Sequence, residues 1–130
     1  MKSTVWRWLP LLLWMLLIFV ESSRPAPSAP GGMRADLLAI AAHLLLFGIT
    51  AFLVLLGRRA LARPRVIDGV VAILVATLYG VSDEVHQSFV PQRRADVMDV
   101  ITDLIGAVVV VAMVFAVAHW RSNLSARTHP

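Results

Sequence analysis

Four apolar stretches separated by short polar segments dominate the chain. They are Val5–Val20, Leu37–Leu56, Val66–Ser82 and about Val100–Trp120. A helix that spans the hydrocarbon core of a bilayer needs about 20 mostly apolar residues, with a range of about 17–25. The second and fourth stretches have this length, the third is at its short end, and the first is marginal because it contains Arg7 and Pro10. The pattern predicts an all-α integral membrane bundle of four transmembrane helices, with outer loops at about 21–36 and 83–99.

The first stretch also fits a second interpretation. A basic start, an apolar run and the small residues that follow are typical of a secretory signal peptide, with a conceivable cleavage after Ser28. Prolines on both sides of that position disfavour the cut. In addition, Trp6, Trp8 and Trp14 are placed as the interface anchors of a retained helix often are. We therefore expect a retained helix, followed by an extended connector rich in proline, glycine and serine over Glu21–Arg34.

The composition excludes several classes of protein. The 130 residues are 58% hydrophobic and 15% charged, with a mean hydropathy of +0.77. An average soluble domain is about 45–50% apolar and about 25% charged, and a chain of this size cannot hide so much apolar surface from water. The chain has no cysteine. A soluble enzyme, a disordered tail and a disulfide scaffold are therefore poor interpretations, and the lipid bilayer is the expected surrounding.

The basic residues indicate topology rather than nucleic-acid binding. The net charge is +4 and the pI is near 11.1, but the 12 basic residues lie between the apolar stretches instead of on one soluble face. Eight of the twelve fall on one side of the predicted crossings: Lys2, Arg7, Arg58, Arg59, Arg63, Arg65, Arg121 and Arg127. The positive-inside rule then predicts that both termini are cytoplasmic. The acidic residues have the opposite bias, since only Asp68 of the eight lies at the cytoplasmic end.

The segment Ser82–Gly106 contains most of the side chains suited to chemistry. Two sets of residues in and beside it follow the spacing that puts side chains on one face of a helix: Tyr79, Asp83 and His86, and then Asp99, Asp103 and Gly106. Each set predicts a polar stripe on an otherwise apolar helix.

A histidine in the second stretch is predicted to reach the stripe of the fourth. His43 lies roughly 10 Å below the outer surface, and Asp103 lies about 6 Å deeper than Asp99, at ~1.5 Å of rise per residue. Ionisable groups in lipid are costly and normally face the interior of the bundle, where they find partners. We therefore predict that His43 contacts Asp103 or Asp99. The alternative is that His43 hydrogen-bonds a neighbouring backbone carbonyl or threonine, as core histidines do.

The candidate site residues follow from these stripes. Candidate ligand-binding residues are Asp83, Glu84, His86, Gln87, Arg93, Asp99 and Asp103, and candidate catalytic residues are His43, Glu84, Asp99 and Asp103. Each has a plainer alternative: Asp83 and Glu84 as surface acids, Asp99 as a cap or first-turn acid, and Arg93 with Arg94 as solvated charges or lipid-phosphate contacts. No metal and no cofactor is expected, because Glu84-Val-His86 offers two potential ligands and the sequence has no third ligand at a spacing typical of a metal motif.

One segment resembles the signature of the VanZ-like membrane proteins. The stretch DEVHQSFVPQRRADVMDVITDLIGA is similar to the loose pattern DExxQxFxPGRxxxxxDxxxNxxG. The matching positions are Asp83, Glu84, Gln87, Phe89, Pro91, Arg93, Asp99 and Gly106. The similarity extends more loosely to the early histidine of the second helix, His43, with the aromatic Phe47 four residues later, and so to nearly the whole chain, 1–130, as one VanZ-like domain.

The chain departs from the family pattern at three places. Gln92 stands where glycine is usual, Asp103 stands where asparagine is common, and Ala39-Ile40 replace an Asp-Lys pair often found before the histidine. A turn that glycine would make must therefore be made differently or be looser. Any role of that lysine is in doubt in this chain.

The resemblance implies a multi-pass protein of the bacterial cytoplasmic (inner) membrane with four helices, including the first. The family takes its name from a member linked to resistance against teicoplanin-type glycopeptides, and its biochemical activity is not defined. Our first hypothesis is a non-enzymatic cell-envelope protein that binds a lipid or cell-wall precursor headgroup at the outer face. The second is a membrane-embedded enzyme acting on a lipid-linked substrate. The third is a proton-linked transporter using His43 and Asp103, which would favour an oligomer because four helices are few.

Overall fold

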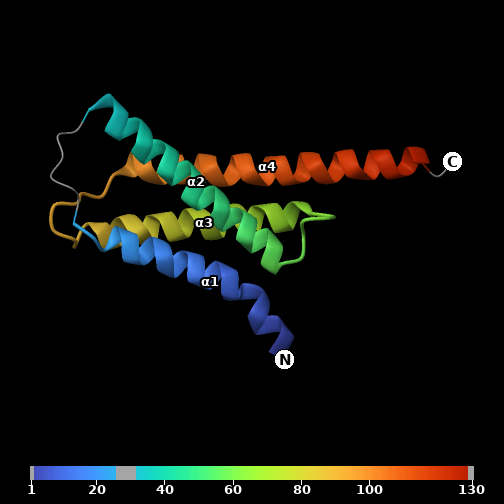
Figure 1. Cartoon of the computed structure of the whole chain (residues 1–130), viewed down its shortest axis with the longest axis horizontal. Helices are drawn as coiled ribbons and strands as arrows, with labels where there is room; N and C mark the ends of the chain where they lie inside the picture. Colours follow the sequence, from blue (N-terminus) through green and yellow to red (C-terminus); the bar gives the residue numbers. More distant parts are fainter. Residues whose placement is uncertain (1, 26–31, 129–130) are drawn as a thin grey trace.

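The computed structural model describes residues 2–25 and 32–128 and consists of four helices (Figure 1). They are α1 (Lys2–Ser22), α2 (Met33–Gly57), α3 (Val66–Gln87) and α4 (Val97–Thr128). Each is long and apolar enough to cross a membrane, and the described residues include no strand. The predicted all-α architecture with four transmembrane helices is confirmed. The middle of the connector, with the conceivable cleavage position Ser28, lies outside the described residues.

The helices extend beyond the apolar stretches that predicted them. Helix α3 continues to Gln87, and α4 begins at Val97 and ends at Thr128. The start of α4 has a local cause, since the Asp96 carboxylate accepts a hydrogen bond from the backbone N–H of Met98 at 2.8 Å, as helix-capping aspartates do. The signature residues from 83 to 87 and at 99 are therefore helical rather than part of a loop.

Helix α1 is integrated into the bundle. The Trp14 indole donates to the carbonyl of Leu46 on α2 at 3.0 Å, and the Tyr79 hydroxyl of α3 donates to the carbonyl of Met15 at 2.5 Å. Pro10 lacks a backbone N–H, and α1 bends in its N-terminal part (Figure 1). The expectation that the first stretch is a transmembrane helix is supported by these packed contacts.

The closest helix crossing is between α2 and α4. A Cβ atom added to Gly106 would lie 2.9 Å from the Cα of Leu44, and one added to Gly48 would lie 3.2 Å from the Gly106 carbonyl oxygen. Glycine is required at this crossing because the two backbones approach too closely for a side chain, a frequent device in transmembrane bundles. Below the crossing, Phe47 and Leu55 of α2 are fully buried.

The arginine-rich end of the bundle is closed by one buried acid. Asp68 begins α3 and is 3% exposed. Its carboxylate accepts from Arg58 Nη2 at 2.6 Å and from Arg65 Nε at 3.2 Å, and it also accepts from the backbone N–H of Arg65 at 3.0 Å. The loop between α2 and α3 is therefore held by a carboxylate whose two oxygens are both paired.

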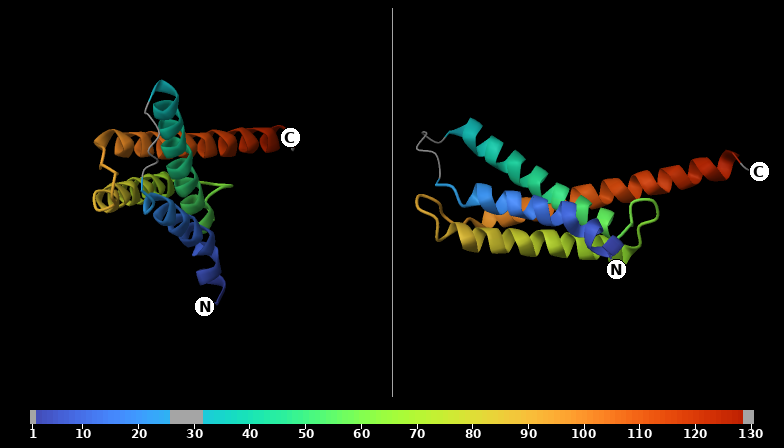
Figure 2. Two further views of the ribbon diagram at one scale, coloured as in Figure 1. Left: turned by 60° about the vertical axis from the view of Figure 1, so that its left-hand side comes forward. Right: turned by 60° about the horizontal axis from the view of Figure 1, so that its bottom comes forward.

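The opposite end of the bundle collects four helix ends. The C-termini of α1 and α3 and the N-termini of α2 and α4 lie together there, while the loop between α2 and α3 lies at the other end (Figure 1). The C-terminal part of α4 projects beyond the other helices in every view (Figure 2). Large apolar side chains cover the outer faces, among them Leu12, Leu38, Leu78 and Met113. This is the surface that lipid would cover.

We expect Gly106→Ala to destabilise the bundle. The added methyl group would force α4 away from the Leu44 backbone, and overpacking of this kind costs about 1–3 kcal/mol. The measurement is the thermal unfolding midpoint of the purified protein in detergent, followed by tryptophan fluorescence. Gly32→Ala is the matched control, because nothing lies within 4 Å of a Cβ added at Gly32. Equal midpoints for the two variants would contradict this account of the crossing.

Candidate functional site

The site lies inside the bundle at the end where the four helix ends meet. It is built from His43 on α2, from Asp83, Glu84 and Gln87 on α3, and from Asp99 and Asp103 on α4, with Arg93 from the connecting loop. Asp83, Glu84, Gln87 and Asp103 are buried, with exposed fractions of 6% or less. Side chains that the sequence places on three different helices thus converge on one interior region.

His43 joins α2 to α4 through both ring nitrogens. Its Nδ1 lies 2.8 Å from Asp103 Oδ1, and its Nε2 lies 3.6 Å from Asp99 Oδ2. With Asp103 ionised, its carboxylate only accepts, and Nδ1 is then the donor in the shorter contact. The predicted contact of His43 with Asp103 or Asp99 is confirmed for both residues, and the plainer alternative of a backbone-bonded core histidine does not hold.

Asp103 is the most deeply buried of the site acids. It is fully inaccessible to solvent, and among the residues that the structure describes only its Oδ1 has a hydrogen-bond partner. Its Oδ2 packs against Gly80 of α3, where a Cβ atom would collide with the carboxylate. The absence of a side chain at Gly80 therefore makes room for this carboxylate, a requirement that the sequence pattern did not reveal.

Glu84 faces α4 with half of its carboxylate paired. Oε2 accepts a hydrogen bond from the backbone N–H of Asp96 at 2.8 Å, while Oε1 is buried without a partner. Glu84 is therefore an interior acid, not the surface acid of the plainer alternative. Nearly all buried polar atoms in native structures are hydrogen-bonded, so the unpaired Glu84 oxygen is open to a further partner.

Arg93 ties the loop between α3 and α4 to the end of α1. Its guanidinium donates to the carbonyls of Arg24 at 2.8 Å and of Glu21 at 3.3 Å, and to Gln87 Oε1 at 3.2 Å. A cation at the C-terminal carbonyls of a helix is favoured by the helix dipole. Arg93 is therefore held by protein contacts that anchor the loop, and it is not simply a solvated charge.

The stripe on α3 that was predicted to share one face does contact α1. Tyr79 donates to Met15, and His86 lies 2.9 Å from the Ser23 hydroxyl, with its ring centroid 4.4 Å from that of Phe19. Asp83 accepts from the Gln87 amide at 2.9 Å, and its other oxygen is unpartnered. His86 is thus engaged with α1 at the rim of the site and is separate from the His43 group.

A cavity of about 260 Å³ opens beside this cluster, between α1, α2 and α3. Its polar lining consists of Glu21, Ser22, His43, Asp83, Gln87 and Arg93, and its apolar lining includes Ile18, Leu46 and Phe47. Four of the predicted site residues thus share one cavity wall. Glu21 and Ser22 were not predicted as site residues, because they follow the apolar first stretch. The sequence placed them in the extended connector, whereas they form the last turn of α1.

The turn after Pro91 is made by a non-glycine residue in the left-handed region. Gln92 has φ of 66°, a conformation that costs L-residues roughly 1–2 kcal/mol and that glycine adopts freely. The turn is therefore made here by a strained non-glycine residue, at the position where the family pattern has glycine.

We expect Gln92→Gly to stabilise the protein by about 1 kcal/mol by relieving that strain. The free energy of unfolding in mixed detergent micelles measures it. Ala95→Gly, in the same loop at a residue without positive φ, is the control and should be neutral or destabilising. A destabilised Gln92→Gly variant would show that the side chain of Gln92, not its backbone, matters.

We expect His43 and Asp103 to be energetically coupled. In a double-mutant cycle with His43→Ala and Asp103→Ala, each single change leaves a buried polar partner unpaired, so the coupling free energy should be about 1–3 kcal/mol. The control cycle uses His119 and Asn123, whose side chains are 3.0 Å apart but exposed, and should give less than about 0.5 kcal/mol. Additive effects of His43→Ala and Asp103→Ala would refute the coupling.

The geometry and the signature agree with one family. The profile of the VanZ/LLP1 family matches residues 7–118, which include most of α1, all of α2 and α3, and most of α4. Searches of curated proteins and of solved structures gave no match. The signature residues Glu84, Asp99 and Gly106 lie within the matched range and within the site or the crossing that supports it. The chain is a multi-pass membrane protein and belongs to the VanZ/LLP1 family.

Proposed function

We propose that this protein binds the polar headgroup of a membrane lipid or lipid-linked cell-wall precursor in the cavity between α1, α2 and α3. The observation that carries the proposal is the cavity itself, whose wall combines His43, Asp83, Gln87 and Arg93 with apolar side chains at one end of a membrane bundle. Pockets that are mostly apolar with a few convergent polar groups are the usual form of ligand sites. A lipid-linked molecule has the same division between polar head and apolar tail.

The charges of the site favour a headgroup rich in hydrogen-bond donors. Acids outnumber bases in the site, and Asp83, which lines the cavity, keeps one carboxylate oxygen without a partner among the described residues. Carboxylates accept hydrogen bonds from hydroxyl and amine groups. A sugar or amine portion of the headgroup therefore suits this wall, whereas a bare phosphate would be repelled unless a cation accompanied it.

The orientation of the chain would open this cavity at the outer face of the cytoplasmic membrane of a bacterium. The loop at the opposite end of the bundle contains Arg58, Arg59, Arg63 and Arg65. Basic loops of this kind are retained in the cytoplasm, so the end with the acids faces outward. Binding of a cell-wall precursor there would connect the protein with the glycopeptide resistance for which its family is named.

The second candidate function is catalysis on the same lipid-linked substrate. The observation that favours it is the Asp103–His43 hydrogen bond of 2.8 Å, which leaves Nε2 of the imidazole directed at Asp99. A histidine oriented by a carboxylate is a common general base. His43 would then move a proton, with Glu84 or Asp99 as the second acid–base group.

Binding can be tested by native mass spectrometry of the purified protein with two probes. One probe is a polyprenyl-diphosphate-linked disaccharide peptide, and the other is the polyprenyl phosphate without the sugar. We expect at least about tenfold preference for the first, reduced about tenfold by Asp83→Asn or Gln87→Ala, since each removes a hydrogen bond to a charged or buried group. Ser82→Ala, exposed on the same helix, should bind like the wild type.

The possible results distinguish a binding protein from an enzyme and show when the proposed function is wrong. Equal retention of both probes, or unchanged binding in Asp83→Asn and Gln87→Ala, would contradict the proposal. A mass change of the bound lipid that requires His43 would favour the enzyme over the binding protein. An unchanged mass with graded losses across the variants would favour binding alone.

A further inference from the structure

Three potential metal ligands from three helices meet in the site. One ligand atom each from His43, Glu84 and Asp99 lies within 4.8 Å of the others. Ligand atoms around a tetrahedral ion bound at about 2.0–2.2 Å are roughly 3.4 Å apart. The ligand atoms therefore need to approach one another by up to about 1.4 Å to share one ion, a movement within reach of side-chain rotation. The sequence named all three residues as catalytic candidates but did not predict a shared metal site, because they lie on different helices.

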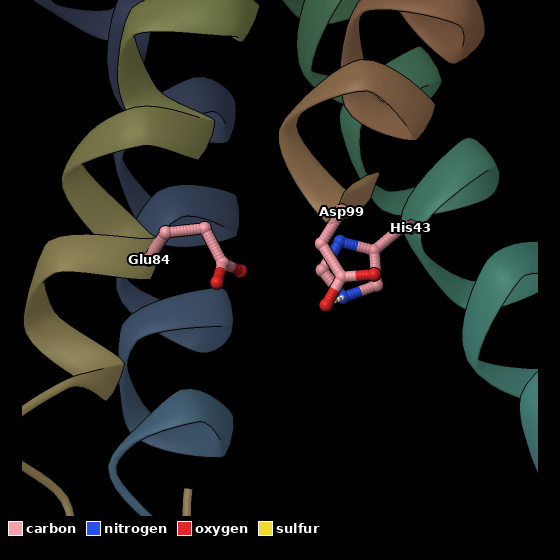
Figure 3. A group of neighbouring side chains, drawn as sticks. All are labelled: His43, Glu84 and Asp99. Carbon is pink, nitrogen blue, oxygen red and sulfur yellow. Dashed lines mark ion pairs between the residues drawn. The ribbon is translucent and has the colours of Figure 1, made fainter. Parts of the chain in front are cut away.

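The unpaired oxygen of Glu84 points to a ligand in this gap. Glu84 is 5% exposed, and its Oε1 has no hydrogen-bond partner. Figure 3 shows its carboxylate directed across the gap toward Asp99 and His43. The contact between His43 Nε2 and Asp99 Oδ2 is 3.6 Å, longer than a hydrogen bond. A cation between the three groups would give each of these atoms a partner.

The neighbouring residues hold the ligands as outer partners of metal sites do. Asp103 accepts from His43 Nδ1, which leaves the Nε2 lone pair free for a metal. The backbone N–H of Asp96 binds the second oxygen of Glu84. A carboxylate behind a ligating histidine and hydrogen bonds to ligating carboxylates are the common outer-shell arrangement. The three potential ligands are therefore held in place by hydrogen-bonded neighbours, which a simple cluster of acids would lack.

From these observations we infer that His43 Nε2, Glu84 and Asp99 bind one divalent transition-metal ion. The donor set, one imidazole nitrogen and two carboxylate oxygens, suits Zn²⁺ or Mn²⁺. Three protein ligands leave at least one coordination position open to another molecule. Resting on the proposed headgroup binding, we assign that position to a phosphate oxygen of the lipid-linked molecule. The ion would supply the positive charge that the acidic wall lacks.

Zinc binding to the full-length protein tests the site directly. The protein is purified in detergent through an affinity tag that carries no histidine, treated with EDTA, and titrated with Zn²⁺ by isothermal calorimetry. We expect one bound ion per chain, with X-ray absorption showing nitrogen and oxygen ligands at about 2.0–2.2 Å. Glu84→Gln and Asp99→Asn should each weaken binding by at least about 100-fold, and Asp103→Asn by about 10–100-fold through the orientation of His43.

Matched variants control for loss of folding and for surface binding. His119→Gln changes an exposed histidine outside the group, and Asp36→Asn changes an exposed acid. Both should bind Zn²⁺ like the wild type. Each variant is first checked for an unchanged elution volume and tryptophan-monitored unfolding midpoint without metal. Folded Glu84→Gln and Asp99→Asn variants that keep wild-type affinity would overturn the inference, as would a wild type that binds neither Zn²⁺ nor Mn²⁺ above a protein-free blank.

The lipid probe separates this inference from the proposed function. Zn²⁺ binding that depends on Glu84 and Asp99, without retention of the lipid-linked probe, supports the metal site and contradicts the proposed function. Retention of the probe by a protein that binds no metal overturns the metal site and leaves headgroup binding standing. If EDTA abolishes retention of the lipid-linked probe and Zn²⁺ restores it, the result supports the metal site, its open coordination position and the proposed function.

Discussion

A buried hydrogen bond between His43 and Asp103 joins α2 to α4. Asp103 is inaccessible to solvent within a membrane-spanning helix, and an ionisable group in such a place requires a partner inside the bundle. One turn further along, Gly106 lets the Leu44 backbone approach closely enough for that bond to form. The need of Asp103 for a partner and the absence of a side chain at Gly106 thus favour the same alignment of α2 on α4. The positions of the other site residues depend on this alignment.

The buried acid at one end of the bundle has both carboxylate oxygens paired, and the buried acids at the other end do not. Asp68 has both oxygens paired by Arg58 and Arg65, so it closes a loop and has no capacity left for a ligand. At the other end, Glu84 and Asp103 each keep one oxygen without a partner. Natural proteins usually satisfy buried polar groups, and exceptions concentrate where function needs them. The end with unpaired oxygens is therefore the end where these acids are open to a further partner.

The loop between α3 and α4 couples the signature residues to the shape of the cavity. Arg93 binds the last carbonyls of α1, and the strained residue Gln92 turns the chain so that Asp96 reaches both Glu84 and the start of α4. The family pattern therefore describes one connected structure rather than a set of independent catalytic groups. Some of its residues position others, whereas His43, Glu84 and Asp99 bring potential ligand atoms within 4.8 Å of one another.

The sequence by itself determined the four membrane helices, their order and the pairing of His43 with the acids of α4. Hydrophobic length and helical periodicity are local properties, and the depth of a residue along a helix follows from its position in the chain. Only the tertiary structure decided that Glu84 turns inward beside Asp99, that Gly80 makes room for Asp103, and that Arg93 anchors a loop. These features depend on the rotation and crossing of the helices. Side-chain packing determines both, and the hydrophobic pattern of the sequence does not encode them.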